Sequence, residues 1–366
     1  MDYSEKLSFH YQTAKGWVND PNGLVYFRGY YHVFYQHLPD FEVPVGQYMH
    51  WGHARTKDFL SWEELPPALC PDMPYDAKGC WSGTAIVKDD TLYLFYASIY
   101  RPQDEQCDLQ TVSVAYSSDG VHFEKYAHNP VIQHYPCDGG PDFRDPAVCF
   151  ADGKYRCVMA SGNPERKTAL LLLYESSNLL DWEYTGIMRE WEDAKYAECP
   201  SFTHMGNGYL LSASVCKDDR HFFFISTGSF KDGVFTPEIE GEVNKGPDQY
   251  AGQVFRDNEG RNILISWIPG WSYIGYADKD VGCMSAACEI KLAQGRLCAY
   301  PVHELQHLLK TEDPAVRLTQ SGFEIERTGR DPVVYNGQLR DLKILRDKYI
   351  LEVYVNGGQE IYTVLL

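Results

Sequence analysis

The chain has 366 residues, a formal net charge of −18 and a hydrophobic content of 44%. A negative charge of this size repels nucleic acid and anionic lipid, and no apolar run of about 18 residues is present that would span a membrane. The eleven cysteines are scattered without a CxxC pair, which favours reduced thiols over a disulfide framework or a zinc site. We therefore expect a cytoplasmic protein with no metal and no other cofactor, acting on a small neutral molecule.

Five segments, taken in chain order, each contain two β-rich runs around a Gly, Asp or Asn turn, which is the pattern of a β-hairpin. They begin at Leu24, Thr84, Ala147, Ser201 and Gln253. A second phrase, a small polar residue followed by Asp or Asn and then by an aromatic residue and Glu, recurs about every 60 residues. Its aromatic residue is Trp62, Phe123 and Trp182 in turn. The chain is therefore built from a repeated β unit.

A repeat of this length, made of short strands with almost no helical periodicity, predicts a β-propeller with five blades. A sandwich of unrelated hairpins is the alternative, but a sandwich does not require equal spacing. In a propeller the first strand of each blade lines the central channel, so the residues that open the hairpins meet near one axis. Three of these openings carry an acid, namely Asp20, Asp145 and Glu198. The repeat thus predicts a cluster of three carboxylates, as in an active site.

Short phrases surround these acids and continue between them. They are WVNDPNG from Trp17, FYQ from Phe34, WGHA from Trp51, CWSGTA from Cys80, RDP from Arg144 and ECP from Glu198. In this order they resemble glycoside hydrolase family 32, the family of invertases, fructan hydrolases and sucrose-6-phosphate hydrolases. The resemblance covers about the first 305 residues. It implies an all-β fold with a five-bladed propeller over residues 1–305, and a retaining hydrolase of terminal β-D-fructofuranosides such as sucrose or short fructo-oligosaccharides.

The resemblance also assigns roles to the acids. It implies that Asp20 is the nucleophile, that Glu198 is the acid/base and that Asp145 stabilises the transition state, with Arg144 beside it in substrate binding. Retention requires one ionised and one protonated carboxyl group about 5–5.5 Å apart. The sequence neighbours of Glu198 are more apolar than those of Asp20, so we expect Glu198 to hold the proton.

Further positions correspond to the fructose pocket of the family. The resemblance implies that Asn19, Gln36 and Ser82 bond fructose hydroxyls, that Trp51 lines the site and that Trp81 packs nearby. The alternative for each is an ordinary hydrogen-bonded polar group or a core aromatic. The histidines that flank Trp51 have no third ligand motif near them, so we predict no metal site.

The C-terminal part departs from the family, whose members usually append a much longer β-sandwich. Only 61 residues remain from Gln306 to Leu366, with alternating residues around an Asn356-Gly357 turn. We expect residues 306–366 to form a small β module, a truncated sandwich that docks on the propeller. A homo-oligomer formed through this module is a further hypothesis.

Three alternatives to the hydrolase remain open. A fructosyltransferase would use the same covalent intermediate and a sugar acceptor in place of water. A sucrose-6-phosphate hydrolase would act on a phosphorylated substrate. A lectin would bind the sugar without cleaving it, although all three carboxylates are present.

Overall fold

The computed structural model describes residues 6–40, 48–103, 105–163, 167–268 and 282–366. This part of the chain is nearly all β, and its one helix is the short 3₁₀ helix η1 (His303–Leu308). None of the described helical residues belongs to a helix long and apolar enough to cross a membrane.

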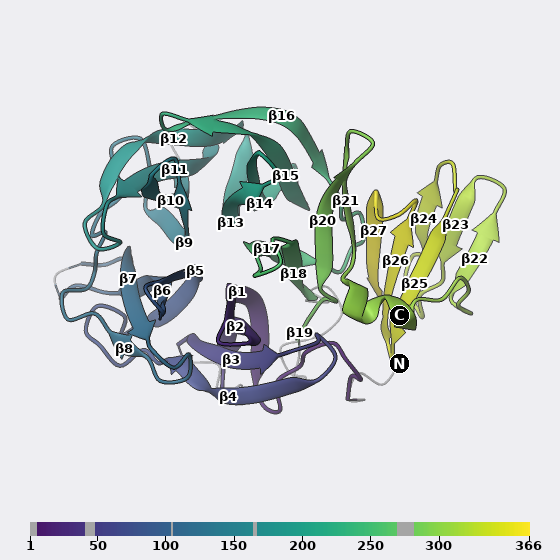
Figure 1. Cartoon of the computed structure of the whole chain (residues 1–366), viewed down its shortest axis with the longest axis horizontal. Coiled ribbons are helices and arrows are strands. Elements are labelled where there is room, and N and C mark those ends of the chain that lie inside the picture. Colours follow the sequence, from purple (N-terminus) through teal and green to yellow (C-terminus); the bar gives the residue numbers. More distant parts are fainter. Residues whose placement is uncertain (1–5, 41–47, 104, 164–166, 269–281) are drawn as a thin grey trace.

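Five antiparallel sheets follow one another around a central axis (Figure 1). The first three contain β1 (Trp17–Phe27), β2 (Tyr30–Leu38), β3 (His50–Thr56) and β4 (Trp62–Leu69); β5 (Gly79–Lys88), β6 (Thr91–Tyr100), β7 (Leu109–Ser117) and β8 (Glu124–Lys125); and β9 (Asp142–Ala151), β10 (Lys154–Asn163), β11 (Thr168–Ser176) and β12 (Glu183–Glu192). The last two contain β13 (Ala194–Met205), β14 (Gly208–Lys217), β15 (Arg220–Lys231) and β16 (Val234–Glu242); and β17 (Tyr250–Arg256), β18 (Asn262–Ile268), β19 (Cys283–Met284), β20 (Cys288–Ala293) and β21 (Arg296–Pro301).

The first strand of each sheet faces the central axis (Figure 1). Each of β1, β5, β9, β13 and β17 contacts the next one around the ring, and β17 contacts β1. The ring is therefore closed by packing between the first and the last sheet. This is the five-bladed β-propeller that the repeat predicted.

The repeated phrase forms one kind of turn between the third and fourth strands of the first three blades. In the first blade, Thr56 Oγ1 accepts hydrogen bonds from the backbone N–H groups of Asp58 and Phe59, and Asp58 Oδ1 accepts from those of Leu60 and Ser61. The equivalent bonds start at Ser117 and at Ser176 in the next two blades. The hydroxyl and the carboxylate or amide oxygen satisfy the turn's backbone donors, which explains why these residue types recur.

The recurring aromatic residue joins neighbouring blades. Phe123 of the second blade packs against Phe34 of the first with ring centroids 5.6 Å apart, and Trp182 of the third packs against Phe95 of the second at 5.8 Å. Both pairs are edge to face, an arrangement that stabilises aromatic contacts beyond the area they bury. The spacing of the aromatic residues in the sequence is therefore the spacing of the blades.

The C-terminal module consists of two three-stranded sheets. They contain β22 (Val316–Thr319), β23 (Gly322–Ile325) and β24 (Val333–Asn336), and β25 (Leu342–Asp347), β26 (Ile350–Val355) and β27 (Glu360–Leu365). Phe323 and Tyr362 pack edge to face between the two sheets. On the other side, Tyr354 and Ile361 share a buried cluster with the fifth blade. The module is thus a small sandwich that docks on the propeller, as expected.

Two expectations about this module stay predictions. The boundary after residue 305 falls within η1, which connects the fifth blade to the module. The outward face of the β22–β24 sheet carries an ion pair between Arg317 and Glu324, and oligomerisation through it remains a hypothesis.

The N-terminal segment ties the module to the propeller. Asp347 accepts hydrogen bonds from the backbone N–H groups of Ser8, Phe9 and His10, and its Oδ2 lies 3.1 Å from His10 Nδ1. Burial lowers the pKa of His10, but hydrogen bonds and charge from Asp347 and Glu352 outweigh it and raise that pKa to about 9. The buried histidine is therefore a cation at neutral pH, and it holds the two parts together.

Candidate active site

All five inner strands are interrupted at the same point of the blade, where the register with the second strand shifts. The interrupted steps are Val18/Pro21, Trp81/Gly83, Arg144/Ala147, Glu198/Ser201 and Tyr250/Gln253. Residues in such a bulge leave the hydrogen-bond ladder, which re-aims the side chains around them. The bulges therefore bring polar side chains from different blades to one end of the channel.

The residue types in the bulges suit this geometry. Asp145 and Cys199 have φ values of 59° and 48°, in the left-handed region that residues with a Cβ rarely adopt. Pro146 and Pro200 follow them, and a proline has no N–H to lose where the ladder is broken. The Asp-Pro and Cys-Pro pairs of the sequence are thus the local signature of the bulges.

The Asp20 carboxylate is held by three neighbours. Ser82 Oγ donates to its Oδ2 at 2.9 Å, Cys199 Sγ approaches the same oxygen at 3.4 Å, and Asn19 Nδ2 donates to Oδ1 at 3.4 Å. The backbone N–H of Cys199 donates to Asp145 Oδ2 at 2.9 Å. Cys199 therefore links the two aspartates, which line one cavity of about 520 Å³ together with Glu198.

Glu198 is held by a cation and a phenol. Arg144 Nη2 donates to its Oε1 at 2.8 Å, and the hydroxyl of Tyr250 donates to its Oε2. The other guanidinium nitrogen of Arg144, Nη1, pairs with Asp142. The side chain of Glu198 therefore sits among polar partners, and not in the apolar surroundings that its sequence neighbours suggested.

The acids perturb one another. Burial, followed by the charges of Glu198 and Asp145, raises the pKa of Asp20 to about 7. Burial raises the pKa of Asp145 to about 6, although Arg144 opposes that change. Both aspartates therefore hold a proton more tightly than an ordinary carboxyl group, which differs from the expectation of a readily ionised Asp20. This corrects the argument from sequence neighbours, because the side chains of adjacent strand residues point to opposite faces.

Five of the six predicted substrate-binding residues line the same cavity: Asn19, Gln36, Trp81, Ser82 and Arg144. The sixth, Trp51, is fully buried and does not line it. Its indole Nε1 donates to the backbone carbonyl of Trp81 at 2.9 Å, and its ring packs in the core beside Phe34. Trp51 thus supports a cavity residue from behind.

The cavity has further lining residues that the sequence did not single out. These are Met49, Gln110 and Asp142. Asp142 lies two positions before Arg144 on the same strand face, which is a signal available in the sequence. Tyr250 precedes the bulge of the fifth blade as Glu198 precedes that of the fourth, so an alignment of the five hairpins would have identified it.

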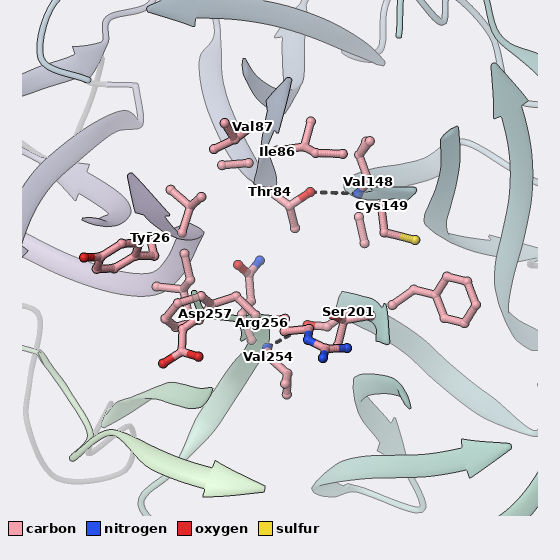
Figure 2. A pocket seen from close by; sticks show the side chains of 18 of the residues that line it. Tyr26, Thr84, Ile86, Val87, Val148, Cys149, Ser201, Val254, Arg256 and Asp257 are labelled. Carbon is pink, nitrogen blue, oxygen red and sulfur yellow. Dashed lines mark hydrogen bonds between the residues drawn. The ribbon is translucent and has the colours of Figure 1, made fainter. Parts of the chain in front are cut away.

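A second cavity of about 520 Å³ lies toward the other end of the inner strands and is lined by residues of all five (Figure 2). Here Thr84 Oγ1 donates to the backbone carbonyl of Pro146 and accepts from the N–H of Val148, and Ser201 Oγ accepts from the N–H of Val254, each at 2.9 Å. The polar side chains at this end join neighbouring blades to one another.

Among the described residues, no group of three or more His, Cys, Asp or Glu side chains is arranged to hold a metal ion. His53, one of the histidines beside Trp51, instead faces His32, with Nε2 2.9 Å from His32 Nδ1. Burial lowers the pKa of both rings, so they form a neutral pair in the core.

Similarity to known proteins agrees with this fold. Residues 10–301 match the N-terminal domain of the glycosyl hydrolases family 32. The chain is 33% identical to a sucrose-6-phosphate hydrolase of Zymomonas mobilis, over 95% of this chain and 71% of that protein. It is 32% identical to a raffinose invertase of Escherichia coli, over 87% of this chain and 69% of that protein.

The fold is also similar to that of a solved family 32 β-fructofuranosidase of Bombyx mori. The TM-score is 0.84 at 24% identity, over 99% of this chain and 89% of that one. The five-bladed architecture, the match over residues 10–301 and the identity to these relatives lead to one conclusion: the chain belongs to glycosyl hydrolase family 32 and is a glycosidase with a carbohydrate substrate.

Proposed function

We propose that the chain is a retaining hydrolase that cleaves terminal β-D-fructofuranosides, such as sucrose or short fructo-oligosaccharides, through a covalent fructosyl-enzyme intermediate. The observation that carries this proposal is the convergence of Asp20, Asp145 and Glu198, from three different blades, on one cavity. A retaining glycosidase needs a carboxylate nucleophile and a carboxylic acid on either side of the scissile bond.

In the first step an oxygen of Asp20 forms a bond to the anomeric carbon of fructose while the glycosidic C–O bond breaks. Glu198 gives its proton to the departing oxygen. In the second step Glu198 takes a proton from water, and the resulting hydroxide displaces Asp20 and restores the enzyme. Asp145 accepts hydrogen bonds from fructose hydroxyls and stabilises the positive charge that develops on the ring.

Asp20 must be ionised to attack, although burial and neighbouring charge raise its pKa to about 7. Hydroxyl groups of a bound fructose unit would donate hydrogen bonds to Asp20 and Asp145, and such bonds favour ionised carboxylates. The leaving-group oxygen would then face Glu198. We infer that substrate binding lowers the pKa of both aspartates, so that Asp20 is ionised when it attacks.

The leaving-group sugar separates two candidate substrates, because one of the relatives is named for a phosphorylated sucrose. Among the described residues that line the cavity, Arg144 carries the positive charge. Its guanidinium group already forms ion pairs with Asp142 and Glu198, so it is not free to bind a phosphate. This arrangement favours a neutral leaving group. Sucrose 6-phosphate hydrolysis is the second candidate, and comparison of kcat/KM for sucrose and for sucrose 6-phosphate separates the two.

The mechanism is tested by the stereochemistry of transfer to methanol. With sucrose and methanol together, a retaining enzyme yields methyl β-D-fructofuranoside, whereas an inverting one yields the α anomer, and NMR distinguishes them. Acid quenching during turnover should leave a fructosyl group on the peptide that contains Asp20, and the Asp20→Asn protein is the matched control. The α product, or a label on another residue, would refute the proposal. Chain-extended oligosaccharides in place of free fructose would indicate a transferase.

A further inference from the structure

Asn22 is a fully buried amide on β1, two residues after Asp20, and the mechanism above gives it no role. Its side chain lies against two residues of the catalytic cavity, Gln36 and Ser82. An amide carries two donor hydrogens on nitrogen and two acceptor sites on oxygen, and a buried one left without partners costs roughly 1–3 kcal/mol. The hydrogen bonds around Asn22 therefore decide which end of its amide faces which neighbour.

One orientation of this amide uses all of its donors and acceptor sites. With the oxygen toward Gln36, Asn22 Oδ1 accepts from Gln36 Nε2 at 3.0 Å and from the Gln36 N–H at 3.3 Å. Asn22 Nδ2 then donates to the Pro21 carbonyl at 3.0 Å and to Ser82 Oγ at 3.2 Å. With the amide reversed, the described residues offer it a single bond, from the Gly83 N–H at 3.4 Å. Because buried polar groups are almost always hydrogen-bonded, the first orientation is the favoured one.

This orientation gives the hydrogen bonds beside the cavity one direction. Gln36 Nε2 uses its second hydrogen for the Cys80 carbonyl at 3.0 Å, so Gln36 Oε1 remains to accept from a substrate hydroxyl. Ser82 Oγ accepts a hydrogen from Asn22 and donates its own to Asp20 Oδ2, 2.9 Å away. A hydrogen bond donated to a carboxyl group favours its ionised form. The donors of Gln36, Asn22 and Ser82 are thus aligned toward Asp20.

This aligned donor opposes the other influences on the nucleophile. The titratable and charged groups that surround Asp20, or that pair with its neighbours, are Arg144, Asp145, Glu198 and Cys199. Burial, followed by the charges of the two other acids, raises the pKa of Asp20 to about 7. The hydrogen bond from Ser82 is one of the contacts that lower this pKa. Its direction therefore matters for the group that must be ionised.

We propose that Asn22 is a positioning residue of the reaction, whose amide holds the Ser82 hydroxyl as a hydrogen-bond donor to Asp20. The proposal rests on the role of Asp20 given under the proposed function. A fully active Asp20→Asn protein would remove that role, whereas the direction of the bonds around Asn22 is measured separately.

The direction of these bonds can be observed in the unmodified, full-length protein. Neutron diffraction from crystals of the perdeuterated protein locates the deuterium atoms of amides and hydroxyls. We expect the deuterium atoms of Asn22 Nδ2 to point at the Pro21 carbonyl and at Ser82 Oγ, and the hydroxyl deuterium of Ser82 to point at Asp20. Deuterium atoms on the side of the Asn22 amide that faces Gln36 would overturn the proposal, with no variant needed.

The consequence for the reaction is tested with Asn22→Leu, Ser82→Ala and the double variant. Leucine has a similar size but no donor, so the acid limb of kcat/KM on sucrose should move to higher pH by roughly 0.5–1 unit. Ser82→Ala should move the limb at least as far. In the double variant Asn22→Leu should add no further shift, because Asn22 acts through Ser82. Additive shifts, or a limb that Asn22→Leu leaves in place, would refute the positioning role.

Gln253→Leu is the matched control for the loss of a buried amide. Gln253 lies beside the same bulge, but its Nε2 donates to the Gly83 carbonyl at 3.1 Å and not to Ser82 Oγ. Its loss should lower the melting temperature, because a backbone acceptor is left without its partner, and should leave the acid limb in place. If the limb moves equally in Gln253→Leu and in Asn22→Leu, any disturbance of the bulge has this effect and Asn22 has no special role.

Discussion

The two ends of the central channel are built from the same five strands, yet their polar side chains are used in opposite ways. At one end the bulges turn Asp20, Asp145 and Glu198 into the cavity, where each carboxyl group faces another. At the other end the hydroxyls of Thr84 and Ser201 form hydrogen bonds with the backbone of the neighbouring blade, so they are already engaged within the protein. The same fold therefore places mutually repelling carboxyl groups at one end of the channel and hydrogen bonds between blades at the other end.

The difference teaches that the bulge, and not the strand, makes the site. A regular inner strand would direct alternate side chains to the channel and satisfy its backbone in the ladder. The interruption frees the Cys199 N–H to donate to Asp145 and lets Cys199 Sγ approach Asp20. Mutations at the two ends should consequently differ in kind, since one set changes the chemistry and the other set changes the stability.

The largest effect is expected from Asp20→Asn. Without a carboxylate nucleophile, kcat on sucrose should fall by about 10⁴-fold or more, measured by the release of glucose and fructose. Residual activity within tenfold of the unmodified enzyme would remove Asp20 from the mechanism.

The same variant should be more stable than the parent above neutral pH. Burial and the charges of Glu198 and Asp145 raise the pKa of Asp20 from 3.8 to about 7, so the folded state binds this proton more tightly than the unfolded state. The resulting stability is present below pH 3.8 and is lost as the pH rises toward 7. Asparagine has no charge to bury, and urea unfolding at pH 8 should show a gain of roughly 1–3 kcal/mol.

The next effect is expected from Glu198→Gln, which cannot protonate a leaving group. We predict that kcat/KM on sucrose falls by about 10²–10⁴-fold, the usual contribution of a general acid. A fructoside with a more acidic leaving group should lose much less, because its departure needs no proton. Equal losses on both substrates would show that Glu198 acts in binding and not in proton transfer.

A smaller effect, near tenfold per pH unit, is expected on the acid side of the pH profile. The buried aspartates have raised pKa values, about 7 for Asp20 and about 6 for Asp145, so the reactive carboxylate is scarce below this range. The value of kcat/KM should therefore fall as the pH drops below about 7. Asp145→Asn removes one of the charges that raise the pKa of Asp20, and should move the surviving acid limb to lower pH. A limb that stays in place would contradict this coupling.

The sequence predicted the residues of this site whose positions recur from blade to blade. It did not predict correctly which other side chains point into the cavity. Asp20 and Asp145 stand directly before the proline of their bulges and Glu198 stands one residue earlier, so the convergence of the three acids followed from the five hairpins. Gln110 reaches the cavity from a third strand, where it accepts a hydrogen bond from the Phe143 N–H, and no local pattern marks it. Trp51 was expected in the site, but the pleat directs its ring into the core between blades.

The smallest kinetic effect, and the sharpest test of the comparison, is expected at the other end of the channel. Thr84→Val keeps the shape of the side chain and removes the hydroxyl that bonds both the Pro146 carbonyl and the Val148 N–H. The backbone groups left without a partner should lower the free energy of unfolding by about 1–3 kcal/mol. Thr84 touches none of the three acids in the described contacts. We therefore expect kcat/KM on sucrose to stay within about twofold, which is less than the tenfold change that a shift of one pKa unit in a catalytic acid would cause.

Ser82→Ala is the matched control at the catalytic end, two positions earlier on the same strand. It removes the hydrogen bond to Asp20 Oδ2, a bond that favours the ionised carboxylate, so its loss should raise the pKa of Asp20 further. Its rate should fall more than that of Thr84→Val, while its stability should fall less, since the carboxylate keeps other donors. If the two hydroxyls cost equal amounts of activity and of stability, the two ends of the channel are not specialised, and the bulges alone do not define the site.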